Sequence, residues 1–149
     1  MAKVNRSLNW MYNMEKFATQ AYRTQAPAFP EQEISRLLKE AVLNEQQHVD
    51  NLRSRILELK GAPSRLGPLF QIAGASFASV TRLLGKQAVM KTDVWIERRA
   101  VRDYGSFLQK VAFDDKSSGP IARIIEDEKR HVENWEHSAL LLKSGPSSR

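Results

Sequence analysis

The chain has 149 residues, which is long enough for one domain whose hydrophobic core needs no disulfide. It contains no cysteine. The absence of cysteine also excludes a thiolate zinc site, an iron–sulfur cluster and a cysteine nucleophile. The net charge of +6 comes from basic residues spread along the chain beside acidic ones, which is typical of solvated helix faces and predicts no nucleic-acid partner.

Glycine and proline divide the sequence into segments with helical periodicity. The first predicted helix covers residues 7–25, with Ser7 as its N-cap, and two prolines follow it. The second covers residues 31–59 and is ended by Gly61 and Pro63. Both segments carry apolar residues at steps of three and four, so each presents one apolar face to a core.

The rest of the chain contains three more predicted helices. Residues 64–85 form a short segment that is apolar over most of its circumference. A long helix is predicted over residues 86–113, followed by a polar loop at 114–119, and the last helix begins at residues 118–120 and continues to Leu142. No segment alternates with the period of a strand.

This order of segments predicts an all-α fold of four long helices, with a short apolar helix in the connection between the second and third. Short joins make antiparallel neighbours, and one long crossover is the connectivity of ferritin-like four-helix bundles. We expect residues 1–149 to form a single domain, with its core at about 7–143 and a flexible tail at 144–149. No apolar run is long enough to span a membrane, and the N-terminal residues lack the apolar stretch of a secretion signal.

Two of the three histidines follow a glutamate by three positions, in Glu45-Gln-Gln-His48 and Glu128-Lys-Arg-His131. This spacing puts both side chains on one face of a helix, and in each segment that face is the apolar one. An inward carboxylate and imidazole are costly to bury unless they are paired or bind a metal ion. His137 lies off this face, and we expect it to be solvated.

The same arrangement occurs twice along the chain. Glu15 and Glu97 lie on the apolar stripes of the other two long helices, and each is followed seven residues later by a tyrosine, Tyr22 or Tyr104. Alone, either glutamate is more typical of a surface acid, but with the two Glu-x-x-His motifs they match the ligand set of a dinuclear carboxylate site in a bundle core. The predicted metal ligands are Glu15, Glu45, His48, Glu97, Glu128 and His131.

Oxygen-rich ligands with imidazole and without sulfur favour iron or manganese over softer metals. We expect two iron ions, with manganese as the alternative, bridged by one glutamate from each half of the chain. Tyr22 and Tyr104 are candidates for a redox or hydrogen-bonding role beside the metals, and packing is the alternative. Asn44 and Asp127 precede the two motif glutamates and are candidates to accept a hydrogen bond from the histidine of the facing helix, with surface polarity as the alternative.

With these residues in place, the chain resembles the Coq7 family of demethoxyubiquinone hydroxylases, within the ferritin-like di-iron superfamily. The likeness runs from about Asn13 to Leu142. It is carried by Glu15 with Tyr22 and Gln25, Asn44-Glu45-Gln-Gln-His48, Leu66-Gly-Pro-Leu-Phe, Leu83-Leu-Gly-Lys, Ile96-Glu97 with Tyr104, and Asp127-Glu128-Lys-Arg-His131.

The resemblance implies a di-iron monooxygenase that uses O₂ to add a hydroxyl group to a polyprenylated benzoquinol in ubiquinone biosynthesis. It also implies a location in the cytoplasm or on the surface of the inner membrane. There the apolar helix at residues 69–84 would lie against lipid and help to admit the isoprenoid tail. A helix that caps the bundle core is the equal alternative, and a homo-oligomer stays open.

Two other functions fit the same ligands. One is a rubrerythrin-like peroxidase or ferroxidase, although the cysteine-bound iron domain that rubrerythrins often carry is absent here. The other is a non-enzymatic helical module that binds metal only structurally. A quinone that co-purifies with the protein would favour the hydroxylase, and rapid peroxide turnover without lipid would favour the peroxidase.

Overall fold

The structure, a computed structural model, describes residues 2–29 and 32–144. Within them the chain forms five α-helices and a short 3₁₀ turn at Ala26–Ala28, and no strand. The helices are α1 (Ala2–Gln25), α2 (Gln32–Glu58), α3 (Gly67–Leu83), α4 (Lys86–Lys110) and α5 (Asp115–Ser144). The predicted all-α fold, with an extra helix between the second and third long helices, is confirmed.

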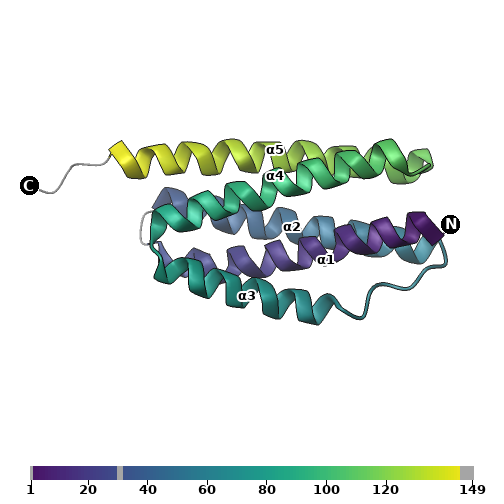
Figure 1. Cartoon of the computed structure of the whole chain (residues 1–149), viewed down its shortest axis with the longest axis horizontal. Helices are drawn as coiled ribbons and strands as arrows, with labels where there is room; N and C mark the ends of the chain where they lie inside the picture. Colours follow the sequence, from purple (N-terminus) through teal and green to yellow (C-terminus); the bar gives the residue numbers. More distant parts are fainter. Residues whose placement is uncertain (1, 30–31, 145–149) are drawn as a thin grey trace, which may run out of the picture.

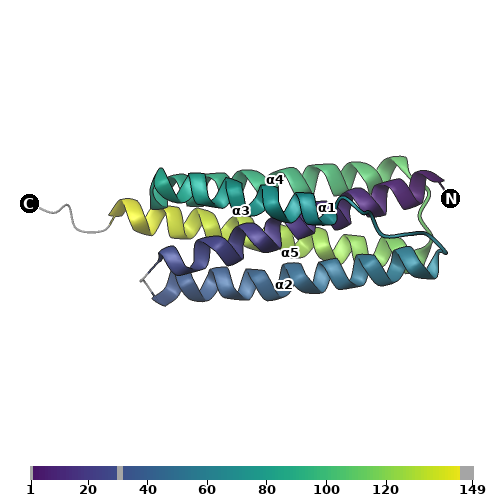
Figure 2. The same cartoon turned by 90° about the horizontal axis from the view of Figure 1, so that it is seen from below.

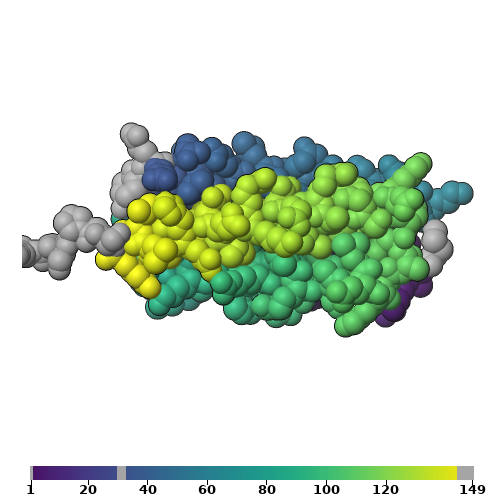
Figure 3. Space-filling model, turned by 90° about the horizontal axis from the view of Figure 1, so that it is seen from above, coloured from purple at the N-terminus to yellow at the C-terminus, as the bar shows by residue number. Residues whose placement is uncertain are grey.

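The long helices form two antiparallel hairpins, α1 with α2 and α4 with α5, which lie side by side (Figure 1, Figure 2). α1 faces α4, and α2 faces α5. The crossover from α2 to α4 contains α3, so α2 and α4 run in the same direction, as in ferritin-like bundles (Figure 1). Figure 3 shows one face of the bundle, on which α5 lies between α2 and α4.

Two apolar clusters fill the bundle, one toward each end. The first joins the C-terminal half of α1 to the start of α2 and α4 and the end of α5, and it includes Tyr22, Leu38 and Trp135. The second joins the opposite halves of the same helices and includes Met11 and Tyr104. The Glu-x-x-His motifs and the other two predicted glutamates occupy the middle of the helices, between these clusters.

α3 packs along α1 and also contacts α4, outside the four long helices. At Gly74 the two helices lie in close contact, since a Cβ atom there would lie 2.3 Å from the backbone oxygen of Phe17. The side chains of Phe17 and Phe77 pack beside this crossing, with ring centroids 5.6 Å apart. The glycine therefore allows α3 to lie directly on the backbone of α1.

Several predicted helix ends were wrong. α1 begins at Ala2 rather than at Ser7, which is buried inside the helix. The extra turns are held by tertiary contacts that local sequence signals do not report, since Val4 packs on the second cluster and Lys3 Nζ donates to the Lys110 carbonyl at 2.8 Å. α4 ends at Lys110 rather than at Phe113.

The predicted polar loop before the last helix is instead its first turn. Asp114 accepts the backbone N–H of Ser117 on Oδ1 at 3.0 Å, which is the contact of an N-cap, so α5 begins at Asp115. Arg55 of α2 also bonds to the Asp114 carboxylate and holds this turn on the bundle. At the other end α5 includes Ser144, and the remainder of the predicted tail, 145–149, lies outside the described residues.

Candidate metal centre

Six ionisable side chains meet at the middle of the bundle, each at most 5% exposed. α1 supplies Glu15, α4 supplies Glu97, and α2 and α5 each supply a Glu-x-x-His pair. They form two groups in which one ligand atom from each residue lies within 4.8 Å of the others. The groups are Glu15, Glu45, His48 and Glu128, and Glu45, Glu97, Glu128 and His131.

Glu45 and Glu128 belong to both groups, so their carboxylates lie between the two candidate metal positions. Each position then has one further glutamate and one histidine of its own. This is the arrangement expected when two hairpins with the same motif face each other, because each contributes one bridging acid. The structure therefore brings together all six residues that were predicted as ligands.

Both imidazoles turn Nδ1 toward these carboxylates. His48 Nδ1 lies 3.3 Å from Glu128 Oε1 and 3.6 Å from Glu15 Oε2, and His131 Nδ1 lies 3.0 Å from Glu45 Oε1. Both carboxylate oxygens of Glu45, Glu128 Oε1 and His48 Nδ1 are nevertheless buried, and within residues 2–29 and 32–144 they have no hydrogen-bond partner. Buried carboxylate and imidazole atoms that converge and lack hydrogen-bond partners suit a cation, so the residues present fit a metal centre.

The charges in the cluster shift its pKa values strongly. Burial raises the pKa of Glu15 and Glu97 well above the usual range, and the carboxylates of Glu45 and Glu128 add to this rise. Burial alone would lower the pKa of His48 and His131, but the surrounding carboxylates outweigh it and raise both. Without a metal ion, the cluster therefore holds protons on both imidazoles and on some of its carboxylates.

Metal binding is expected to weaken as the pH falls, because protons and cations compete for the same buried atoms. The raised pKa values of His48 and His131 mean that each imidazole gives up a proton when it binds a metal ion. The apparent affinity should fall on the order of tenfold per pH unit for each proton displaced. Competition with a chelator between about pH 6 and pH 8 measures this slope. An affinity that does not change over that range would contradict metal binding by these imidazoles.

The two tyrosines contact the ligand glutamates of the opposite hairpin. The Tyr22 hydroxyl on α1 donates to Glu97 Oε1 on α4, and the Tyr104 hydroxyl on α4 donates to Glu15 Oε1 on α1. Burial raises the pKa of both phenols, so they stay protonated donors. Each tyrosine thus holds one carboxylate in place, whereas a redox role for either stays a prediction.

Asp127 makes the hydrogen bond predicted for it. Its Oδ2 lies 3.0 Å from Nε2 of His48 on the facing helix, which orients that imidazole. The matching prediction for Asn44 was wrong: its amide donates to Asp127 Oδ2 at 3.4 Å, and no hydrogen bond joins it to His131 among the described residues. His131 instead borders a surface cavity of about 460 Å³ between α2 and α5. His137 is exposed, as predicted.

Replacing Asp127 by asparagine is expected to weaken metal binding roughly 10- to 100-fold, because the His48 imidazole loses the carboxylate that orients it. The variant keeps the size of the side chain and leaves all six candidate ligands in place. Asp50→Asn, an exposed change on α2, is the matched control and should bind metal as the wild type does. Equal affinities for all three proteins would show that Asp127 does not act on the site.

One buried acid near the centre was not predicted. Asp93 of α4 has no exposed surface, and its Oδ1 accepts a hydrogen bond of 2.8 Å from Gln25 Nε2 on α1. Burial raises the pKa of Asp93 to about 8. The sequence signal was its position four residues before Glu97 on the same apolar stripe, between Met90 and Ile96.

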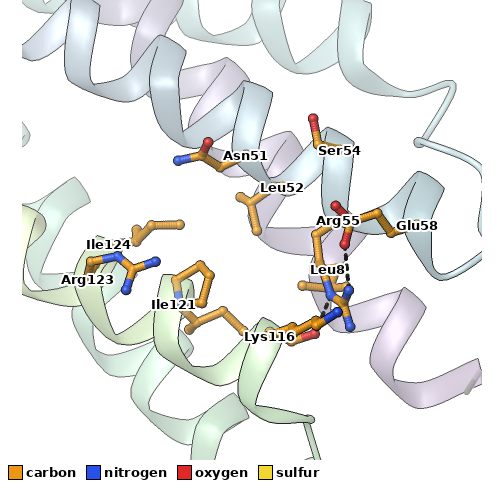
Figure 4. Close-up of a pocket in the computed structure, with 12 residues that line it drawn as sticks. Leu8, Asn51, Leu52, Ser54, Arg55, Glu58, Lys116, Ile121, Arg123 and Ile124 are labelled. Atoms are coloured by element: carbon orange, nitrogen blue, oxygen red, sulfur yellow. Dashed lines mark hydrogen bonds and ion pairs between the residues drawn. The ribbon is translucent and has the colours of Figure 1, made fainter.

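Two further cavities border the bundle. One, of about 390 Å³, is lined by side chains of α1, α3 and α4 that are apolar except for Arg99. The lining includes Met14 and Ile96, the neighbours of Glu15 and Glu97 in sequence. Another, of about 230 Å³, lies between α2 and α5, and Figure 4 shows Arg55, Lys116 and Arg123 around it. This second cavity is lined by no predicted metal ligand.

The outward face of α3 is apolar. Leu69, Ile72, Val80 and Leu83 are each more than half exposed, whereas Gly74 and Ala78 face α1 and are buried. None of the described helices combines the length and hydropathy that crossing a bilayer requires. Because these apolar side chains are exposed, the apolar face of α3 lies along the outside of the bundle, next to the 390 Å³ cavity.

Comparison with known proteins identifies a family and a relative of this chain. The family described as "Ubiquinone biosynthesis protein COQ7" matches residues 12–141, a span that contains all six candidate ligands. The chain is 29% identical over 110 residues to a Dictyostelium discoideum protein named "NADPH-dependent 3-demethoxyubiquinone 3-hydroxylase, mitochondrial". That alignment covers 70% of this chain and 51% of the relative, so the chain spans about half of the relative's length.

Proposed function

The chain belongs to the Coq7 family of ubiquinone biosynthesis proteins, and from this premise we propose that it hydroxylates a polyprenylated benzoquinol with O₂ at a di-iron centre. The observation that carries the proposal is the convergence of six buried ligand residues from four helices into two groups with shared glutamates. The described residues would act as one ferritin-like domain in which the helices serve to hold this cluster.

In this proposal Glu15 and His48 would hold one iron ion, Glu97 and His131 would hold the other, and both ions would share Glu45 and Glu128. Iron bound by these residues would supply the activation of O₂. The protein supplies the rest: it neutralises the two cations with four carboxylates, fixes two of these carboxylates through tyrosine hydroxyls, and excludes bulk water. Manganese suits the same ligands and is the alternative metal.

The cavity between α1, α3 and α4 is the best position for the substrate ring. Its lining includes Trp10, Phe17 and Trp95, and a ring in it would lie next to the segments that carry Glu15 and Glu97. The apolar face of α3 would then rest on the surface of the inner membrane and admit the isoprenoid tail from lipid. The electrons would come from a reduced nicotinamide dinucleotide, the donor that the relative's name states for that protein.

The test of this function is a reaction with defined components. The iron-loaded protein receives a demethoxyubiquinol, NADPH and isotopically labelled O₂, and the products are analysed by mass spectrometry. We expect one labelled oxygen atom in a new hydroxyl group on the ring. Rapid consumption of peroxide or oxidation of Fe²⁺ without a hydroxylated quinol would favour the peroxidase or ferroxidase instead.

Contact with the membrane is tested separately. Ile72→Glu/Val80→Glu places two charges on the exposed face of α3, and we expect it to abolish co-sedimentation with anionic phospholipid vesicles. Leu43→Glu adds a charge at a similarly exposed leucine of α2 and serves as the control. Equal binding of both variants and the wild type would show that α3 does not contact the membrane.

A further inference from the structure

Asp93 is a buried acid that none of the roles above uses. It lies on α4 one turn before Glu97, has no exposed surface, and sits between residues of the first apolar cluster along the helix, Met90 and Ile96. A carboxyl group placed in such surroundings is costly unless it is neutral or well paired. Its presence therefore needs an explanation.

In the part of the chain that the structure describes, Asp93 has one hydrogen-bond partner, Gln25 of α1, whose Nε2 donates to Asp93 Oδ1 at 2.8 Å. Gln25 lies three residues after Tyr22, and Asp93 lies four residues before Glu97, so the two helices are joined by two neighbouring hydrogen bonds. The inner one, Tyr22 to Glu97, touches a candidate metal ligand, and the outer one, Gln25 to Asp93, lies behind it.

The other half of the molecule lacks this outer pair. The positions that correspond to Asp93 and Gln25, counted from Glu15 and Tyr104, are Met11 and Phe107. Both are apolar and pack in the second cluster. The bundle therefore folds around the same site with apolar residues at these positions, and the polar pair is an addition confined to the side of Glu97 and His131.

The hydrogen bonding between Asp93 and Gln25 lacks a donor unless Asp93 carries a proton. Asp93 Oδ2 and Gln25 Oε1 are both buried, and neither has a hydrogen-bond partner among the residues that the structure describes. Both atoms are acceptors when the acid is ionised. A proton on Oδ2 supplies the missing donor. Burial raises the pKa of Asp93 to about 8, although the bond from Gln25 lowers it, so the acid is mainly neutral at pH 7.

The charge of Asp93 affects Tyr22, which contacts a candidate metal ligand. Ionised Asp93 raises the pKa of the Tyr22 phenol, whose hydroxyl donates to Glu97. The ionisable groups that face this side of the site are Tyr22 from α1, Glu45 from α2, Glu97 from α4 itself, and Glu128 and His131 from α5.

We propose that Asp93 is a proton-holding residue, which keeps one exchangeable proton beside the Tyr22–Glu97 hydrogen bond on one side of the metal centre. Its role in turnover rests on the proposed hydroxylase function. Insertion of one atom of O₂ into a ring C–H bond, with release of the other atom as water, consumes two electrons and two protons. The nicotinamide donor gives up a hydride, which supplies both electrons and one of the two protons. Asp93 supplies the other proton: its Oδ2–H bond breaks, a carboxylate remains, the proton ends in the water, and solvent restores it.

The protonation itself is tested on the metal-free protein by infrared spectroscopy. The wild type should show a carboxylic acid C=O band that is missing from Asp93→Asn, and this band should disappear with a midpoint near pH 8. Asp50→Asn, an exposed acid-to-amide change, should leave the band in place. Spectra of wild type and Asp93→Asn without a difference in this band would overturn the proposal, whatever the protein's activity.

The role in turnover is tested on the iron-loaded protein. Asp93→Asn keeps the shape and the hydrogen bond to Gln25 but cannot release a proton, so it should retain iron and slow hydroxylation by at least roughly tenfold. Asp93→Glu keeps an acid and should recover part of the rate. A merely structural role predicts that Asp93→Asn is as active as the wild type, and that result would overturn the proton-holding role. If no variant hydroxylates a quinol, the proposed function fails while the infrared result stands.

Discussion

Glu128→Ala is expected to lose both metal ions and all oxygen-dependent turnover, while the helical bundle stays folded. Glu128 belongs to both ligand groups, so its removal takes a carboxylate from each metal position. The fold should survive because the metal-free cluster gathers four carboxylates in one buried space, and the loss of one reduces their repulsion. Metal content per chain and far-ultraviolet circular dichroism, measured on the same sample, check both parts of this expectation.

Glu126→Ala is the matched control for this variant. Glu126 lies two residues earlier on α5, is exposed and pairs only with Lys129 on its own helix among the described residues. It should retain both metal ions, since a surface ion pair contributes little. Glu97→Ala removes a ligand from one group only and should therefore retain more metal than Glu128→Ala. A Glu128→Ala protein that holds as much metal as the control would contradict the bridging position.

Gly74→Ala is expected to destabilise the protein by about 3 kcal/mol, the upper part of the usual range for an overpacked contact. The added Cβ would lie 2.3 Å from the Phe17 backbone oxygen, so the crossing of α1 and α3 must open. Backbone cannot move aside as a flexible side chain can. Urea denaturation of the metal-free protein measures the change in the free energy of unfolding.

Gly105→Ala provides the control for this prediction. Gly105 also lies inside a helix, α4, but nothing lies within 4 Å of a Cβ atom built there. Alanine favours the helix over glycine by roughly 0.5–1 kcal/mol, so this variant should be more stable than the wild type. If Gly74→Ala were as stable as Gly105→Ala, the close packing of α3 on α1 would be wrong.

The order and type of the helices were predictable from the sequence because apolar periodicity and the positions of glycine and proline are local signals. The helix ends were less predictable. The first turns of α1 are polar and are held by contacts with distant residues, such as that of Lys3 with Lys110. The start of α5 depends on which of several polar residues acts as the N-cap. Asp114 takes that role, and Arg55 of α2 bonds to its carboxylate.

The candidate ligands were predictable because the same glutamates and histidines recur in both halves of the chain, and a repeat of this kind is visible without a structure. The features that break the repeat were not. Asn44 was expected to mirror Asp127, but it donates to that carboxylate instead of serving His131. Asp93 has no counterpart in the first half, so comparison of the halves gave no reason to single it out. The contact of α3 with α1 likewise depends on the packing of distant segments.

The central claim is that six side chains from four helices bind a pair of metal ions in one buried site. Anomalous diffraction at the iron edge, from crystals of the iron-loaded protein, tests it most directly. We predict two neighbouring peaks, one beside His48 and one beside His131, with the carboxylates of Glu45 and Glu128 between them. Iron peaks only at the protein surface, with none inside the bundle, would contradict the metal centre and the oxygen chemistry assigned to it.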